Sequence, residues 1–162
     1  GSNGILFNHE SPRRGETFVT KKIIRALVRI KMGIQKKLVL GNLDSKRDWG
    51  HARDYVEAMW KILQLRRPDD FVIATGKQYT VKHFINLVCK KLKIKIIWKG
   101  KGLNESAYNE KGDAIIKIDK KYFRPTEVDT LLGDASKAKK ILKWKPKVNI
   151  HGLIEEMISY EM

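Results

Sequence analysis

Residues 4–15 have the sequence Gly4-Ile5-Leu6-Phe7-Asn8-His9-Glu10-Ser11-Pro12-Arg13-Arg14-Gly15, an apolar run followed by a polar segment with two adjacent arginines. The run 4–7 has the composition of a buried strand, and apolar residues recur at helical spacing across 17–31. A strand that ends in a polar turn before a helix places donors at the carboxyl edge of a sheet, where open α/β sheets bind ligands. Two arginines at that edge suit an anion such as a phosphate, whereas the alternative is a surface loop with solvated arginines.

Strands and helices alternate along the rest of the chain, which indicates the α/β class. The pattern predicts strands at 4–7, 38–40, 71–74, 94–98 and 115–118, and helices at 17–31, 51–65, 81–92, 135–142 and 149–160. Polar composition predicts loops at 8–16, 44–50 and 99–112. Thr80 is expected to cap the helix that follows it. Helical spacing places Met59, Trp60 and Phe84 in the core.

Composition excludes several classes of protein. The 162 residues are 42% hydrophobic, which is typical of a globular domain rather than a disordered chain. No apolar run reaches the ~18 residues of a membrane span, so we expect no membrane insertion. One cysteine, Cys89, and four scattered histidines do not match a metal site, and a core thiol in a cytoplasmic protein is the expected role of Cys89. Gly1-Ser2 is expected to be a tag remnant.

The net charge of +16 raises nucleic-acid binding as an alternative function, because basic domains neutralise phosphates. The excess lysines are spread along the chain rather than gathered in one helix or loop, however. Many of them occupy the polar positions of amphipathic helices, where a solvated face is the ordinary arrangement. No zinc-finger, homeodomain or RNA-recognition signature accompanies them, so we expect nucleic acid not to be the partner.

Two further blocks carry a resemblance to a known family. The segment Arg47-Asp48-Trp49-Gly50-His51-Ala52-Arg53-Asp54 resembles a motif of the extended short-chain dehydrogenase/reductase superfamily. Together with residues 8–14 and with Arg124-Pro125-Thr126-Glu127-Val128-Asp129, it resembles the GDP-mannose 4,6-dehydratase family within that superfamily. The resemblance extends from about residue 3 to about residue 146. The first and last blocks are specific to that family.

The resemblance implies an NADP-dependent lyase that converts GDP-mannose into GDP-4-keto-6-deoxymannose. The sequence has no glycine-rich phosphate loop after a first strand and no Tyr-x-x-x-Lys motif, both of which the family carries in its upstream part. We therefore expect the C-terminal, substrate-binding portion of the enzyme in residues 3–162, without a complete Rossmann half. Residues 4–7 and 71–74 would be late strands of the nucleotide-binding sheet. The portion alone is expected to be inactive.

The resemblance also assigns binding residues. His9 and Arg14 are expected to contact NADP near its nicotinamide half. The residues expected to bind the sugar nucleotide are Asn8, Thr17, Val19, Lys22, Asn42, Arg47, Arg124 and Glu127. Arg47 and Arg124 would hold the pyrophosphate, since a guanidinium matches phosphate oxygens, and Glu127 would accept from ribose hydroxyls.

Each of these assignments has a simpler alternative. His9 could be an imidazole bonded to the backbone of its own loop, and Arg47 could pair with Asp48 or Asp44. Arg124 and Glu127 could pair with each other on the surface. Two rival functions also stay open, a basic binding module for nucleic acid or an acidic partner, and another extended dehydrogenase acting on a different nucleotide sugar.

The two apolar strands carry an expectation about assembly. Strands 4–7 and 71–74 are of the type buried on both faces of a parallel sheet. Without the neighbours that such strands need, their edges and apolar side chains would be exposed. We therefore expect self-association, as a homo-oligomer or by strand addition.

Overall fold

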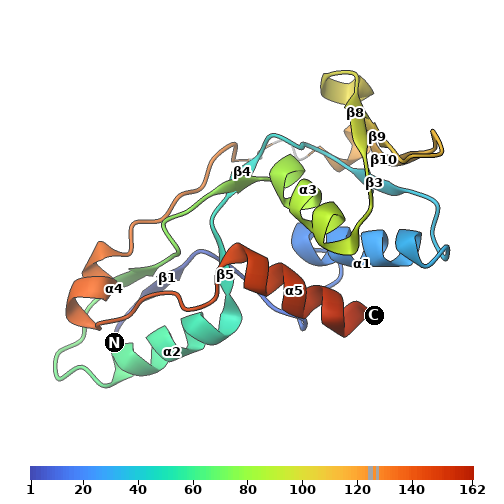
Figure 1. The fold of residues 1–162 in the computed structure, drawn as a ribbon. Coiled ribbons are helices and arrows are strands. Elements are labelled where there is room, and N and C mark those ends of the chain that lie inside the picture. Colours follow the sequence, from blue (N-terminus) through green and yellow to red (C-terminus); the bar gives the residue numbers. More distant parts are fainter. Residues whose placement is uncertain (124–125, 127) are drawn as a thin grey trace.

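A computed structural model describes residues 1–123, 126 and 128–162 of the chain. Figure 1 shows an elongated α/β molecule with helices and short strands at both ends. Its helices are α1 (Val19–Lys31), α2 (Ala52–Leu63), α3 (Val81–Leu92), α4 (Ser136–Ile141) and α5 (Ile150–Glu161). Two separate hydrophobic clusters form its core. The predicted α/β class is confirmed.

The larger cluster is built from three helices and a four-stranded sheet. Helices α1, α3 and α5 pack against one another on one side of that sheet (Figure 1). The strand order is β3-β10-β9-β8, in which β3 and β10 are parallel and the other pairs are antiparallel. Its strands are β3 (Leu38–Leu40), β8 (Ile97–Lys99), β9 (Ser106–Tyr108) and β10 (Ala114–Ile118).

The smaller cluster lies at the other end of the molecule. There β1 (Gly4–Leu6) and β6 (Phe71–Ile73) form a parallel pair, and α2 and α4 pack nearby. Phe71 and Ile73 are fully buried, but Gly4 and Ile5 are exposed. This agrees with the expectation that a strand of this type, without its usual neighbours, leaves apolar side chains and one edge uncovered, since no described strand pairs with the second edge of β1.

Two short strand pairs run through segments that were predicted to be loops. β2 (Asn8–Glu10) pairs in parallel with β5 (Trp49–His51), and β4 (Lys46–Arg47) pairs antiparallel with β7 (Tyr79–Thr80). The loop predictions for 8–16 and 44–50 are corrected accordingly. The segment 99–112 likewise contains β9 and a short 3-10 helix, η1 (Gly102–Asn104). These strands are too short to show an alternating pattern, and the partners of β2 and β4 are distant in sequence.

The core predictions on the helices are correct in one case and wrong in two. Phe84 of α3 is fully buried, and Thr80 caps this helix by accepting a hydrogen bond from the backbone N–H of His83. Met59 and Trp60 of α2 are exposed instead, Trp60 to 60%. Helix α2 buries the face of Tyr55, Ala58 and Ile62, so the apolar residues beside that face point away from the described core.

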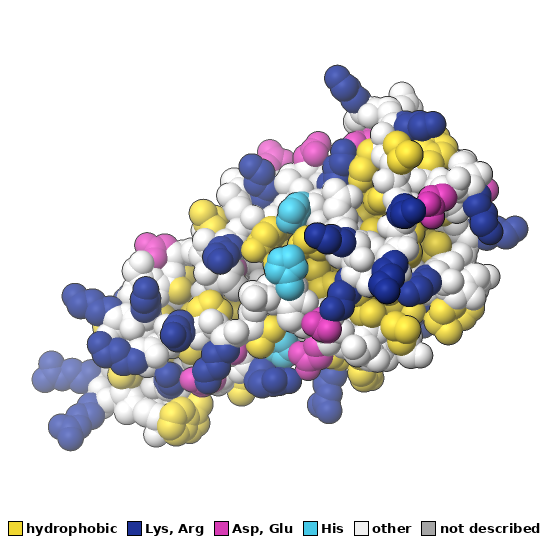
Figure 2. All heavy atoms as spheres, viewed as in Figure 1, with side chains coloured by type: hydrophobic (Ala, Val, Ile, Leu, Met, Phe, Trp, Pro, Cys, Tyr) yellow, Lys and Arg dark blue, Asp and Glu magenta, His cyan; other side chains and the backbone are white. Residues whose placement is uncertain are grey.

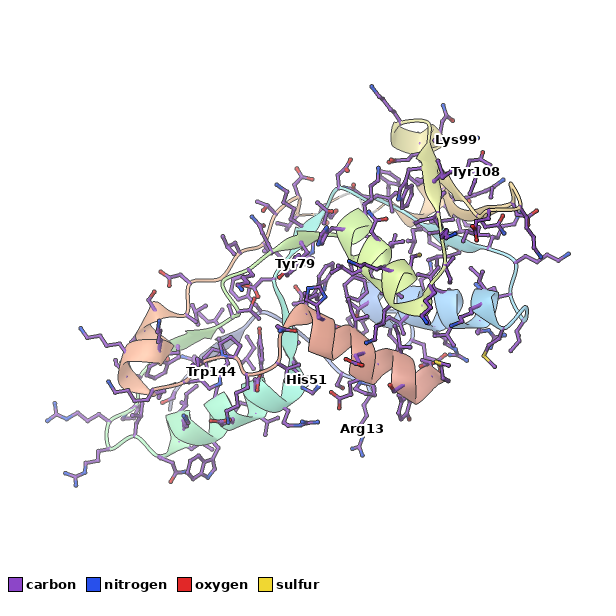
Figure 3. All side chains as sticks on the ribbon, viewed as in Figure 1. Arg13, His51, Tyr79, Lys99, Tyr108 and Trp144 are labelled. Carbon is purple, nitrogen blue, oxygen red and sulfur yellow. The ribbon has the colours of Figure 1, made fainter. Side chains whose placement is uncertain are left out.

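Polar contacts tie the C-terminal segment to the centre of the molecule. The indole Nε1 of Trp144 donates to the backbone oxygen of Asp54 at 2.8 Å, and the Asp54 carboxylate accepts from the N–H groups of Lys147 and Val148. His51 lies where β5 meets α5 (Figure 3) and its Nε2 lies 2.6 Å from the carboxylate of Glu156. The His51 Nδ1 accepts from the N–H of Arg53, so Nε2 carries the hydrogen and donates. These bonds hold β5 in a fixed place beside the candidate site.

Candidate functional site

A cavity of about 280 Å³ lies between β2, the start of α1 and the segment that joins β3 to β4. Its size is close to the lower end of the range for small-molecule sites. Residues from four separate parts of the chain line it: Asn8, Glu10, Arg14, Thr17, Phe18, Val19, Lys22, Leu40, Gly41, Asn42, Ser45, Arg47, Trp49, Val81 and Tyr122. The fold therefore converges on one polar cavity from residues that are far apart in sequence.

This cavity brings together six of the eight residues predicted to bind the sugar nucleotide. They are Asn8, Thr17, Val19, Lys22, Asn42 and Arg47. The remaining two, Arg124 and Glu127, lie outside the described residues. Arg14, expected on the cofactor, lines the same cavity and places a third cation beside Lys22 and Arg47.

The predicted cofactor residues share a second, neighbouring hollow. Ile5, Leu6, Phe7, Leu131, Asn8, His9 and Arg14 line it. Asn8 and Arg14 line both hollows, so the two spaces adjoin. Ligands bound in adjoining hollows would lie in contact with each other.

The imidazole of His9 is held by its own strand and by α2. Its Nδ1 lies 2.8 Å from the backbone oxygen of Phe7, and because a carbonyl only accepts, Nδ1 donates. In the neutral ring this leaves Nε2 as an acceptor. The ring also stacks on Tyr55 with centroids 5.1 Å apart. The backbone hydrogen bond expected as the alternative to ligand binding is therefore present. It engages only Nδ1 and orients the ring, so Nε2 remains available to a ligand.

Arg14 is fixed by an acid that sequence analysis did not single out. Its Nε lies 3.2 Å from the carboxylate of Glu10, and its guanidinium stacks over the ring of Phe18 at 3.6 Å. The hydroxyl of Thr20 donates to the same Glu10 oxygen at 2.5 Å. Burial raises the pKa of Glu10, and the bond from Thr20 and the charges of Arg14 and His9 oppose that rise. Residues 10–14 are not helical, so their four-residue spacing gave no signal of this pair in the sequence.

At the far side of the cavity the backbone of Gly41 lies very close to the backbone of Tyr122. A side chain at Gly41 would place its Cβ 2.4 Å from the backbone oxygen of Tyr122, so only glycine fits there. Tyr122 in turn lies under the ammonium of Lys22, whose Nζ is 4.1 Å from the ring centroid. Gly41 thus lets the segment after β10 reach the cavity, a contact that the sequence did not predict.

Arg47 is the last residue of β4 and lines the cavity, whereas the side chain of the next residue, Asp48, bonds to other segments. The Arg47 Nη1 donates to the backbone oxygen of Lys46 at 2.9 Å. Asp48, proposed as a possible ion-pair partner of Arg47, is fully buried and accepts hydrogen bonds from Thr75, Gly76 and Gly133 through both of its oxygens. Asp48 therefore anchors the strand that carries Arg47.

The lysines and arginines outside the cavity do not form one continuous stripe on the face drawn in Figure 2, where they alternate with neutral and apolar surface. Several are paired, such as Lys147 with Glu57 and Lys137 with Asp69. Among the described residues no group of three acids, histidines or cysteines could hold a metal ion. No described helix has the length and apolarity to cross a membrane.

Known proteins give this cavity a context. A model of the GDP-mannose 4,6 dehydratase family matches residues 1–157. Over 160 residues the chain is 53% identical to GDP-mannose 4,6 dehydratase 2 of Caenorhabditis elegans, covering 99% of this chain and 42% of the relative. Over 161 residues it is 53% identical to the Homo sapiens GDP-mannose 4,6 dehydratase, covering 99% of this chain and 43% of that protein. The chain spans less than half the length of these curated relatives.

Solved structures agree on the fold. RMD from Pseudomonas aeruginosa, solved in complex with NADPH, superposes with a TM-score of 0.77 at 19% identity, over 98% of this chain and 46% of that one. UDP-glucuronic acid 4-epimerase from Bacillus cereus, in complex with UDP-glucuronic acid and NAD, gives 0.76 at 18% identity, over 99% and 44%. The fold is thus that of part of an extended short-chain dehydrogenase/reductase. With a family model matching almost all of its length, the chain belongs to the GDP-mannose 4,6-dehydratase family.

Proposed function

We propose that this chain supplies the sugar-nucleotide-binding portion of an NADP-dependent GDP-mannose 4,6-dehydratase, a lyase. The supporting observation is the cavity that unites six of the predicted substrate residues with three cations, Arg14, Lys22 and Arg47. A nucleoside diphosphate carries its charge on adjacent phosphates, and a guanidinium binds such oxygens through two parallel hydrogen bonds. Arg47, and Arg124 outside the described residues, would hold this diphosphate, and Glu127 would accept from the ribose.

The cofactor belongs in the second hollow. A bound NADP would supply the acceptor for the hydride that leaves C4 of the sugar and the donor that delivers it to C6. His9 offers an acceptor through Nε2, and Arg14, fixed by Glu10, offers a positive charge at the boundary with the first cavity. These residues fit one end of the cofactor. The sequence contains no glycine-rich loop for its pyrophosphate.

The proposal assigns ligand binding, without catalysis, to this chain. Residues 3–162 form the binding portion, and strands 4–7 and 71–74 belong to a nucleotide-binding sheet. Because the sequence has no Tyr-x-x-x-Lys motif for proton transfer, the chain alone binds ligand without turnover. Burial raises the pKa of the Cys89 thiol to about 12, so little of the reactive thiolate forms at neutral pH, and Cys89 has the character of a core thiol. We propose a cytoplasmic location for the protein.

Calorimetric titration of the purified chain with GDP tests the proposal. GDP should bind, and Arg47→Ala should weaken binding on the order of ten- to a hundredfold, the effect of losing one charge-assisted contact. Arg53→Ala is the matched control, because Arg53 is an exposed arginine on α2 that pairs with Glu156 and lines neither cavity. It should leave the affinity unchanged.

Binding of a duplex DNA oligonucleotide distinguishes the proposed function from the rival one, a basic binding module for nucleic acid. If the chain is a basic binding module, Arg47→Ala and Arg53→Ala should weaken DNA binding equally, and GDP should not compete with the DNA. Absence of GDP binding by the intact chain would contradict the proposal.

A further inference from the structure

Ser45 lies in the wall of the first cavity with its side chain unpaired. It is 1% exposed, and among the described residues its hydroxyl has no hydrogen-bond partner. Its backbone is held firmly, since the Ser45 carbonyl accepts from the N–H of Val81 at 3.1 Å. A buried hydroxyl without a partner loses its hydrogen bonds to water and gains none in return. A hydroxyl in such a place in a cavity wall indicates that its partner arrives with a ligand.

Asn42 gives the same wall a donor of fixed orientation. Its Oδ1 accepts from the backbone N–H of Asp44 at 2.9 Å, which leaves the Nδ2 group as the side that can reach a ligand. Asn42 and Ser45 are both neutral and both come from the turn between β3 and β4. This wall therefore offers donors and an acceptor but no charge.

Apolar side chains accompany the polar pair. Leu40 precedes the turn, and Val81 is bonded to it through the Ser45 carbonyl, and both line the cavity. Within a nucleotide, only the base combines a flat apolar face with a hydrogen-bonding edge. The phosphates need the cations, and the ribose has no extended apolar face. The neutral wall consequently suits the base.

We propose that the Ser45 hydroxyl is a direct contact to the edge of the bound guanine base and adds to the selection of the nucleotide. A turn of the serine side chain about χ1 moves the hydroxyl between the wall and the cavity without moving the backbone. The hydroxyl can accept from a ring N–H or an amino group of the base. This inference rests on the proposed function, because it assigns the guanine base of the same nucleotide to the wall formed by Asn42 and Ser45.

The test is Ser45→Ala with two measurements. Without ligand the variant should melt at the same temperature as the unchanged chain or higher, because the substitution removes an unpaired buried hydroxyl and no hydrogen bond. Its affinity for GDP should nevertheless fall about three- to tenfold in calorimetric titration, the effect of one lost neutral hydrogen bond. A residue that only supports the fold would not combine unchanged or raised stability with weaker binding.

A second ligand identifies the part of the nucleotide involved. Ribose 5-diphosphate, measured by competition against GDP, keeps the sugar and phosphates but lacks the base, so Ser45→Ala should not change its affinity. Equal losses for GDP and ribose 5-diphosphate would overturn the assignment to the base. Equal GDP affinity in the unchanged chain and Ser45→Ala would overturn the contact itself.

Ser159→Ala is the matched control. Ser159 is an exposed residue of α5 whose hydroxyl donates to the backbone oxygen of Glu155, and it lines neither hollow. Ser159→Ala should change neither the affinity for GDP nor the affinity for ribose 5-diphosphate. Failure of the unchanged chain to bind GDP at all would count against the proposed function, and a bound GDP that ignores Ser45 would count against this inference alone.

Discussion

The carboxylate of Asp48 accepts two hydrogen bonds from Thr75, from its backbone N–H at 2.9 Å and from its hydroxyl at 2.6 Å. The second oxygen of Asp48 accepts from the N–H of Gly76 at 2.9 Å and of Gly133 at 3.3 Å. One fully buried acid thereby joins the loop after β6 and the segment before α4 to the end of β4. Since Arg47 is the preceding residue, Asp48 fixes the backbone that carries a cavity cation.

Asp48→Asn should therefore damage both stability and binding. The amide keeps one oxygen but turns an NH₂ group toward N–H donors, so at least one buried pair is lost. We expect the free energy of unfolding to fall by about 2–3 kcal/mol. GDP affinity should fall with it, because the Arg47 backbone loses its anchor. Urea unfolding and calorimetric titration measure the two effects.

Asp44→Asn is the control for this prediction. Asp44 is exposed, and its backbone N–H, which the substitution retains, makes the bond to Asn42. Stability should be unchanged within ~0.5 kcal/mol. A urea midpoint for Asp48→Asn equal to that of Asp44→Asn would contradict the anchoring role.

Gly41→Ala should open the far side of the cavity. The added Cβ would lie 2.4 Å from the backbone oxygen of Tyr122, so the segment that follows β10 has to move away. The contact between Lys22 and the Tyr122 ring should be lost, with a stability cost of about 1–3 kcal/mol. We expect weaker GDP binding and a lower melting temperature.

Gly152→Ala offers a comparison at a helical glycine. Its Cβ would meet Val148 at 3.3 Å, and the substitution favours the helix. GDP affinity should stay the same. If Gly41→Ala also leaves GDP affinity unchanged, the closeness of Gly41 and Tyr122 has no part in ligand binding.

Helix positions could be predicted from the sequence more fully than the strands around the site. The apolar spacing of 81–92 and the cap at Thr80 are local signals, and both are confirmed. The β2-β5 pairing joins residues about 40 positions apart through backbone bonds, for which no local pattern exists. Buried acids such as Glu10 and Asp48 made their segments resemble loops. Seven cavity residues were nevertheless named from the resemblance, whereas Glu10, Gly41 and Ser45 depend on contacts that only the fold creates.

The raised pKa of Glu10 predicts an unusual dependence of stability on pH. Burial favours the protonated carboxyl, so its contribution to stability is fully present below the ordinary value of 4.5 and is lost as the pH rises through the raised pKa. Glu10→Gln cannot titrate. The melting temperature of the unchanged chain relative to Glu10→Gln should therefore increase as the pH falls from 7 towards 4.5, and level off below.

Glu57→Gln gives the opposite sign. Hydrogen bonding to Lys147, with a further bond from Lys61, lowers the pKa of Glu57, so its contribution is present above 4.5 and is lost as the pH falls through the lowered value. The advantage of the unchanged chain over Glu57→Gln should shrink in acid. Parallel curves for the two variants would show that burial does not govern Glu10.

Self-association is the last prediction, and α2 supplies its surface. Val56, Met59, Trp60 and Leu63 recur at helical spacing on this helix and are 41–77% exposed. The nearby strand β1 has a second edge that no described strand pairs with, and Ile5 on it is exposed. Apolar surface beside an open strand edge favours contact with another chain. The net charge of +16 opposes that contact, so added salt should strengthen association by screening the charge.

Sedimentation across a concentration series at low and moderate salt should show a monomer converting to a larger species, and Trp60→Glu should shift that conversion to higher concentration. Leu103→Glu makes the same charge change at an exposed apolar residue of η1, at the far end of the molecule, and should leave the conversion in place. A monomer at every concentration and salt, or equal effects of the two glutamates, would show that the α2 surface does not mediate assembly.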